Sequence, residues 1–229
     1  NIPAIISTAQ KGGISNTMYQ QIAEYFQANS GRFLTMLSAH LRISLCALLL
    51  AILIGVPAGF LCVQYRRLQR PATTLFGILR IIPSLAILLL MLPVLGTGAA
   101  PATVALVLLA VPPILENTIA GLDGVPPFLM ETAEGLGMEP RQAFAKVRLP
   151  LALPLALTGM KTAAVEIIAS ATLAARIGAG GLGDLIFTGI GLFRTDLLLI
   201  GGGSVALLSL STGFFFSLLE TILLKYKII

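Results

Sequence analysis

Charged residues are scarce in this sequence: Asp, Glu, Lys and Arg make up only 11% of its 229 residues, whereas hydrophobic residues make up 56%. A soluble domain carries about a quarter charged residues. The composition therefore excludes an ordinary soluble enzyme and predicts an integral membrane protein. The net charge of +5 would suggest a nucleic-acid partner in a soluble protein. In a membrane protein the positions of the charges matter more than their sum, so we expect no nucleic-acid partner.

Residues that build catalytic and metal sites are almost missing. The two cysteines, Cys46 and Cys62, fall on one predicted helix, about 24 Å apart by helical rise, which is too far for a disulfide bond. We expect the only histidine, His40, at the outer membrane boundary. The sequence holds no metal-ligand cluster, and no Ser/His/Asp or Cys/His set is spaced for catalysis. It therefore predicts that the chain is not an enzyme and has no catalytic residue, metal or cofactor of its own.

Nucleotide-binding motifs are also absent or misplaced. No GxxxxGK[ST] sequence occurs, so any ATP must be handled by a partner. Gly178, Gly180 and Gly183 in "IGAGGLG" satisfy the dinucleotide pattern GxGxxG. That pattern binds a pyrophosphate only after a strand and at the start of a helix, whereas here it follows a predicted membrane helix. We interpret it as a flexible, closely packed turn.

Long apolar runs dominate what is present. Crossing about 30 Å of hydrocarbon takes about 20 helical residues, and the short alternating pattern of barrel strands is missing. The sequence predicts an all-α integral membrane protein with an N-terminal outer or interfacial segment at 1–42 and a transmembrane domain at 43–229. Gly55 and Gly59 have the spacing that permits close helix approach. Five stretches have the required length: 43–63, 74–95, 102–122, 151–175 and 197–222.

The basic residues of the loops predict the orientation. Eight lie on one side of the five spans and five on the other, and the positive side faces the cytoplasm. The N-terminus is therefore predicted outside and the loop at about 126–150 inside. The eight are Arg66, Arg67, Arg70, Arg141, Lys146, Arg148, Lys225 and Lys227, and the five are Lys11, Arg32, Arg42, Arg176 and Arg194.

One loop, "ETAEGLGMEPRQAFAKVRLPLALP" at 131–154, is unusually polar. Its Gly and Pro positions predict a short helix over 127–136, a stop at Gly137 and a second helix from Pro140 to Val147. A solvated loop is one interpretation. The other is a partner surface, because five apolar residues recur among the charges at helical spacing: Leu129, Ala133, Leu136, Phe144 and Val147.

This loop resembles the EAA loop of permease subunits from binding-protein-dependent ABC importers, which reads E-A-A, three residues, G, nine residues, then I-x-L-P. Thr132 replaces Ala and Val147 replaces Ile. The resemblance extends over about 30–229 and implies the fold of methionine importers, with five core helices per subunit and two subunits per pore. It also implies that this cytoplasmic EAA coupling loop docks on an ATPase through Glu131, Thr132, Ala133, Gly137, Val147, Leu149 and Pro150.

The resemblance implies the partners as well. They are ABC ATPase subunits that carry ATP and Mg, an extracytoplasmic solute-binding protein, and a second permease subunit that is either a copy of this chain or a paralogue. The chain would then be a multi-pass protein of a bacterial or archaeal cytoplasmic membrane.

Three further stretches suggest the cargo. "RIIPSLAILLLMLPVLG", "PPILENTIAGL" and "ATLAARIGAGGLGDLIFTGI" are similar to permeases of the osmoprotectant branch, which import glycine betaine, choline and carnitine. Glu116 stands where that branch often has a basic residue. Two alternatives remain open: an ABC permease for methionine or another small amino-acid-like solute, and an ion-coupled secondary carrier.

The second to fourth spans are predicted to line the translocation path, with Pro83, Ser84, Glu116, Asn117 and Lys161 among its residues. Pro83, Pro112 and Pro113 are expected to bend their helices, and we place the gate near Ser84 and Asn117.

Two charges inside the spans are predicted to form a pair. A charge in a membrane helix costs roughly 2.5–3.5 kcal/mol, so Glu116 and Lys161, at similar predicted depth, are expected to pair. Glu166 points about 140° away from Lys161 and is the poorer partner. In the alternative interpretation, Lys161 reaches the headgroups and Glu116 faces an aqueous path.

Overall fold

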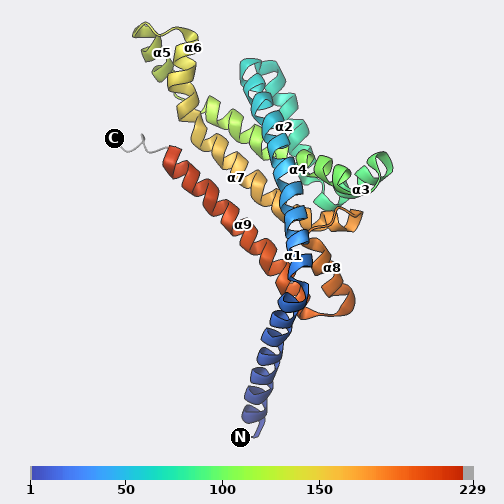
Figure 1. Ribbon diagram of the computed structural model, residues 1–229. Coiled ribbons are helices and arrows are strands. Elements are labelled where there is room, and N and C mark those ends of the chain that lie inside the picture. Colours follow the sequence, from blue (N-terminus) through green and yellow to red (C-terminus); the bar gives the residue numbers. More distant parts are fainter. Residues whose placement is uncertain (1, 224–229) are drawn as a thin grey trace.

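The computed structural model describes the backbone of residues 2–223 and the side chains of residues 18–223 (Figure 1). Every regular element in this part of the chain is a helix, which confirms the all-α prediction. The elements are α1 (Ile2–Gln64), α2 (Arg66–Ile81), α3 (Ser84–Leu95), α4 (Ala99–Asp123), α5 (Pro127–Gly135), α6 (Pro140–Ala143), the π-helical turn η1 (Phe144–Arg148), α7 (Leu149–Ala174), the 3₁₀ turn η2 (Ala175–Ile177), α8 (Gly183–Leu192) and α9 (Thr195–Leu223).

Among the described residues, four helical segments are long and apolar enough to cross a membrane, and the count is five when the bent pair α2 and α3 is taken as one span. The third and fifth predicted spans agree with α4 and α9 to within three residues. Figure 1 places the α1–α2 turn, the α5–α6 loop and the end of α9 at one end of the bundle, which we call the loop end. This is the grouping that the basic residues require, and the orientation of the loop end in the membrane stays a prediction.

The second span is not the single helix predicted over 74–95. It is bent by 98° between α2 and α3. Ile82 is extended, with ψ 125°, because the Pro83 ring disfavours the helical conformation of the residue before it. Pro83 then precedes the first turn of α3. The proline therefore breaks the span rather than merely bending it.

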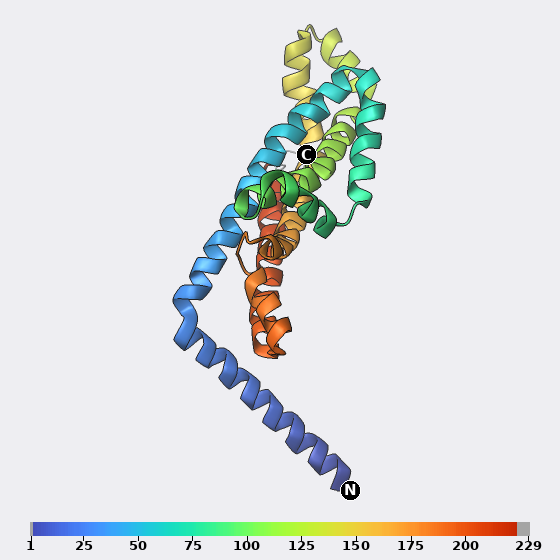
Figure 2. The same ribbon diagram turned by 90° about the vertical axis from the view of Figure 1, so that its right-hand side faces the viewer.

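The first span extends far beyond the predicted 43–63. α1 passes through residue 42 without interruption, and its non-helical residue is Asn29, with φ −130° and ψ 19°. Figure 2 shows the resulting bend in α1, and Tyr25, before the bend, still belongs to a buried cluster with residues of α7, α8 and α9. The side chains of residues 1–17, part of the predicted N-terminal segment, lie outside the described residues.

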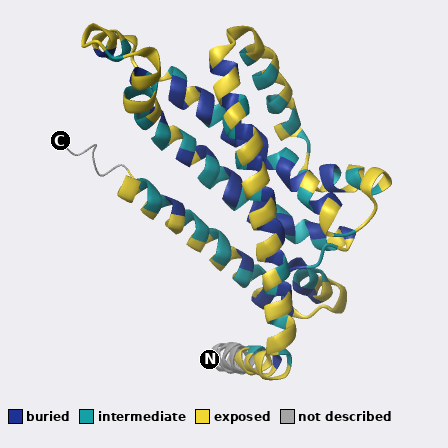
Figure 3. Cartoon of the chain, turned by 45° about the horizontal axis from the view of Figure 1, so that its top comes forward, coloured by how far each residue is buried: buried dark blue, intermediate teal, exposed yellow. Residues whose placement is uncertain are grey.

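The core of the bundle is α4, which packs between α1 and α7 (Figure 3). Pro112 and Pro113 are fully buried in it. A Cβ at Gly55 would lie 2.9 Å from Ile114 Cγ2, and a Cβ at Gly59 would lie 2.8 Å from Thr118 Cβ. These contacts confirm the predicted close helix approach, with α4 as the partner helix.

The fourth span is joined to the polar loop without a break. The helical segment from Pro140 to Ile177 is continuous, whereas two helices separated near residue 149 were predicted. Pro150 has no N–H for the carbonyl one turn earlier. Just before Pro150 the backbone hydrogen bonds span five residues instead of four, as in a π-helix: the Leu149 N–H donates to the Phe144 carbonyl. The π turn η1 therefore lets the helix accommodate this proline.

The glycine-rich stretch after α7 is a tight turn, as predicted. Gly178, Gly180 and Gly181 have φ between 73° and 98°. A Cβ at Gly183 would lie 2.0 Å from the Thr172 carbonyl oxygen, so this glycine is required by packing. The short apolar helix α8 that follows was not predicted.

His40, predicted at the outer membrane boundary, is buried inside the bundle, and its depth in the membrane stays a prediction. Only 1% of its surface is exposed, and its Nε2 lies 3.1 Å from the Ile168 carbonyl oxygen. Gly181 packs on the other side of the ring, where a Cβ would lie 3.1 Å from His40 Nδ1. His40 is therefore a buried packing residue. Cys46 and Cys62 are both free, as expected.

Candidate coupling loop and translocation path

The polar loop folds as a short helix, α5, followed by a glycine stop. Leu136 N–H donates to the Thr132 carbonyl, and Met138 N–H donates to the Ala133 carbonyl at 3.1 Å. Gly137 has φ 82°, the left-handed conformation that ends helices and favours glycine. Pro140 then begins the next helix at its first turn. The predicted break between the two helices is therefore confirmed.

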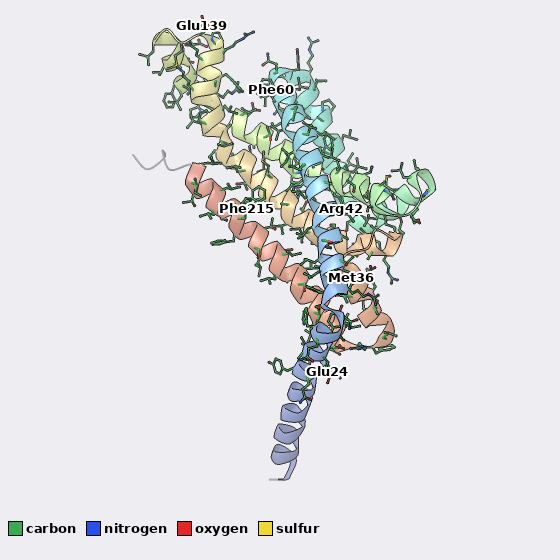
Figure 4. The ribbon with its side chains drawn as sticks, viewed as in Figure 1. Glu24, Met36, Arg42, Phe60, Glu139 and Phe215 are labelled. Atoms are coloured by element: carbon green, nitrogen blue, oxygen red, sulfur yellow. The ribbon has the colours of Figure 1, made fainter. Side chains whose placement is uncertain are left out.

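The apolar residues of the loop are not all available to a partner. Ala133 is buried, and Phe144 packs edge to face on Phe60 of α1, with ring centroids 5.3 Å apart. Phe128 and Leu136, in contrast, are 61% and 75% exposed. The exposed apolar surface of α5 thus includes Phe128, which is not one of the five apolar residues at helical spacing. Figure 4 shows Phe60 near the end of α1 and Glu139 at the far tip of the loop.

The predicted docking residues are spread over two surfaces. Glu131, Thr132 and Gly137 are exposed along α5 and its end. Val147 and Pro150 line a hollow of about 480 Å³ together with Lys146 and Leu151. Leu149 is 47% exposed. A larger cavity, of about 640 Å³, separates the end of α1 from the loop, and Phe60, Tyr65, Met130, Glu134 and Arg141 are among its lining residues.

A polar network ties the loop to α2 and α4. Asp123 ends α4 and accepts from Arg66 of α2 at 3.0 Å. Arg148, in η1, lies 3.8 Å from the other oxygen of the same carboxylate and donates through Nε to the Leu122 carbonyl at 3.1 Å. A cation at a helix C-terminus is favoured by the helix dipole. The network therefore connects η1 directly to the end of α4.

Changing Gly137 tests the backbone of this loop. Nothing lies within 4 Å of a Cβ built at Gly137, so its positive φ and not crowding restricts the residue. Gly137→Val should cost about 1–3 kcal/mol of local strain and lower ATP-dependent transport several-fold without loss of membrane insertion. Gly137→Asn should retain most of the transport, because Asn tolerates this conformation. Equal transport by the Val and Asn variants in proteoliposomes would contradict the assignment.

Inside the spans, the predicted pair of Glu116 and Lys161 is wrong. Glu116 accepts from Arg80 of α2, with Oε2 3.3 Å from Nη1. The other nitrogen, Nη2, lies 3.5 Å from Glu166 Oε1 of α7. Lys161 instead donates to Ser217 of α9 at 2.7 Å. An arginine inside a predicted span is a strong signal, and Arg80 could have been found from the sequence on that ground.

The remaining path residues differ in how open they are. Asn117 is half-buried; its amide donates to the Pro113 carbonyl at 2.8 Å, and its Cβ packs on Gly159. It is therefore part of the crossing between α4 and α7. Pro83 is exposed and Ser84 is half-exposed at the break between α2 and α3. A gate at this break stays a prediction.

The opposite end of the bundle carries its own ion pair. Arg194 forms a bidentate pair with Asp196 across the turn between α8 and α9. Hydrogen bonding to Asp196 raises the pKa of the Arg194 guanidinium, and burial partly opposes this shift. The pair fixes the start of α9, since Asp196 is buried and lies in its first turn.

The sequence matches a known protein family and two named relatives. The family described as "Binding-protein-dependent transport system inner membrane component" matches residues 47–224. The choline transport system permease protein OpuBB of Bacillus subtilis is 42% identical over 192 residues, which cover 82% of this chain and 87% of that protein. The carnitine transport permease protein OpuCB of Listeria monocytogenes is 41% identical and covers 87% of this chain and 91% of its own length.

A solved structure shares the fold. The chain is similar to an inward-facing conformation of the MetNI methionine ABC transporter, with a TM-score of 0.74. The match covers 83% of this chain and 95% of that one, at 22% sequence identity. The fold expected from the loop resemblance is thereby confirmed.

Proposed function

The chain belongs to the family of binding-protein-dependent transport system inner membrane components, and we propose that it is the permease subunit of an ABC importer for quaternary amines of the choline, carnitine and glycine betaine class. The proposed cargo rests on one observation, the 41–42% identity to two permeases named for choline and carnitine over more than four-fifths of the chain. The 22% identical methionine transporter supports the fold alone.

In this function, ATP binding, solute delivery and transport across the membrane belong to different subunits. The chain has no P-loop, so a separate ATPase binds ATP and Mg. Its docking surface is the exposed face of α5 with Glu131, Thr132 and Gly137, together with the hollow beside Val147 and Pro150. A solute-binding protein delivers the cargo at the opposite end. A second permease subunit completes the pore.

The loop geometry suggests how ATP closure reaches the pore. A displacement of α5 by the ATPase moves η1 and α7 as well, since the helix is continuous from Pro140 to Ile177. Arg148 passes the same movement to the end of α4 through Leu122 and Asp123. α4 and α7 then move against α2, whose break at Pro83 gives the span a place to bend. The permease thereby alternates between inward-open and outward-open states.

Uptake in proteoliposomes tests this function. The chain would be reconstituted with its ATPase and binding protein, and uptake of labelled choline, carnitine, glycine betaine and methionine would be measured. We expect ATP-dependent uptake of at least one quaternary amine, competed by the others and unaffected by methionine. ATP-dependent uptake of methionine alone would contradict the cargo. Uptake driven by an ion gradient without ATP would contradict the whole assignment.

A further inference from the structure

Three charged side chains from three helices meet on a face that this chain leaves open. Arg80 of α2 lies between Glu116 of α4 and Glu166 of α7, at 3.3 and 3.5 Å. The three side chains are 44%, 32% and 41% exposed. A lipid-facing surface at these positions would put three charges into hydrocarbon, each at a cost of several kcal/mol. The face must therefore border water or another polar surface.

Helix α7 is polar along the side that carries Glu166. Thr158, Thr162 and Glu166 recur at intervals of four along α7 and so lie on one side of it. The hydroxyls of Thr158 and Thr162 are exposed and donate to carbonyls within α7, which leaves their lone pairs able to accept. A stripe of acceptors thus runs along α7 and reaches the cluster.

The break in the second span lies next to the cluster. Arg80 is in the last turn of α2, two residues before the extended Ile82 and three before Pro83. Broken membrane helices expose backbone carbonyls, and such carbonyls bind cations in membrane transporters. The cluster therefore lies where the span can both bend and offer additional acceptors.

The ion pairs in the cluster are incomplete. Strong guanidinium–carboxylate bonds are about 2.7–2.9 Å long, and both distances here are longer. Among the described residues, only one oxygen of each glutamate contacts Arg80, through Glu116 Oε2 and Glu166 Oε1. With both glutamates ionised the cluster carries a net charge of −1. Its composition favours a ligand with positive charge, and for a zwitterion it also offers a fork for a carboxylate.

We propose that Arg80, Glu116 and Glu166 form a binding site for the substrate in transit, in which a quaternary ammonium lies against the two carboxylates and a substrate carboxylate lies against the guanidinium. The proposal rests on the proposed function, because that function supplies the cargo class. A quaternary ammonium has no N–H to donate, so it is held by charge and contact alone. Aromatic rings are the usual alternative, but the chain has no Trp, the strongest cation–π partner, and its aromatic residues are four Tyr and 11 Phe. Carboxylates take their place.

The site makes opposite predictions for substitution of its arginine and of its glutamates. Arg80→Gln changes the net charge of the cluster from −1 to −2 and removes the carboxylate partner. It should raise the ratio of choline uptake to glycine betaine uptake at least tenfold. Glu166→Gln or Glu116→Gln leaves a neutral cluster that still holds the guanidinium. Each should lower choline uptake at least tenfold and shift the ratio the other way.

The experiment uses the complete reconstituted importer, with the ratio measured at equal amounts of assembled complex. Glu220→Gln is the matched control, since Glu220 lies on α9 and forms no ion pair with any of the described residues; it should leave the ratio unchanged. If the wild type moves one probe only, that probe's KM is compared across the variants, and a rise of at least tenfold for the glutamate variants on choline, or for Arg80→Gln on glycine betaine, is expected.

The outcomes separate the two proposals. A wild type that transports none of choline, glycine betaine and carnitine contradicts the proposed function and, with it, the transit site. If it transports carnitine alone, carnitine replaces glycine betaine as the zwitterionic probe. A transporting wild type whose three variants stay within twofold of it overturns the site alone. The site is equally overturned if all three variants lose both probes by one common factor and lose thermal stability, because that pattern indicates a purely structural ion-pair cluster.

Discussion

Gly159→Leu is expected to destabilise the bundle and to lower its Tm by several degrees or more. A Cβ at residue 159 would already lie 2.7 Å from the Pro113 carbonyl oxygen and 2.7 Å from Asn117 Cβ. The first is backbone of a helix that is buried along this stretch, so the neighbour cannot rotate away. α4 and α7 would have to separate along their shared crossing. Overpacking of this kind costs about 1–3 kcal/mol or more, which corresponds to a fall in Tm of several degrees for a chain of this size.

The measurement is the Tm and the monodisperse yield of the purified chain in detergent. Gly203→Leu on α9 is the control, because nothing lies within 4 Å of a Cβ there. Gly159→Ala should fall between the wild type and the Leu variant. A Gly159→Leu protein with the yield and Tm of the control would show that α4 and α7 do not pack as closely as described.

Replacing Phe128 and Leu136 by serine should abolish coupling to the ATPase. These side chains are 61% and 75% exposed on the short helix α5 and at its end, although both are large and apolar. Burial of a Phe or Leu side chain in an interface is worth about 1.5–3 kcal/mol each. Loss of both should weaken ATPase binding by at least about 100-fold and reduce transport to background, while the permease still folds.

Binding is measured with purified ATPase titrated onto the permease in detergent, alongside transport in proteoliposomes. Glu139→Gln serves as the control, since Glu139 is exposed at the tip of the loop and is not apolar (Figure 4). Wild-type affinity in the double serine variant would remove the exposed face of α5 from the docking surface.

The sequence predicts the long helices well and their irregularities poorly. Hydrophobic length alone placed α4 and α9, because a membrane helix must satisfy its backbone within itself. Hydrophobic length does not indicate the bend at Pro83 or the π turn before Pro150. A proline in a membrane helix can bend the helix, break it or be accommodated without a break. Which of these occurs depends on what packs beside the proline.

The side-chain partners inside the bundle were harder still. Matching the depths of Glu116 and Lys161 paired the wrong groups, because depth fixes a level in the membrane and leaves the direction around the helix open. Arg80 reaches Glu116 from the broken span, and Lys161 turns to Ser217 of α9. The loop motif, in contrast, could be found from the sequence, since a glycine stop and a first-turn proline are local signals.

The uninterrupted helix from Pro140 to Ile177 has a mechanical consequence. Its 38 residues form a rod about 57 Å long. If such a rod pivots by about 5° at its loop end, its far end sweeps through about 5 Å by simple geometry of a helix of this rise. The arm multiplies a small displacement into one comparable to the width of a small solute. The widened turn at Phe144–Arg148 lies between the loop and Glu166, so the displacement that reaches Glu166 depends on the stiffness of this turn.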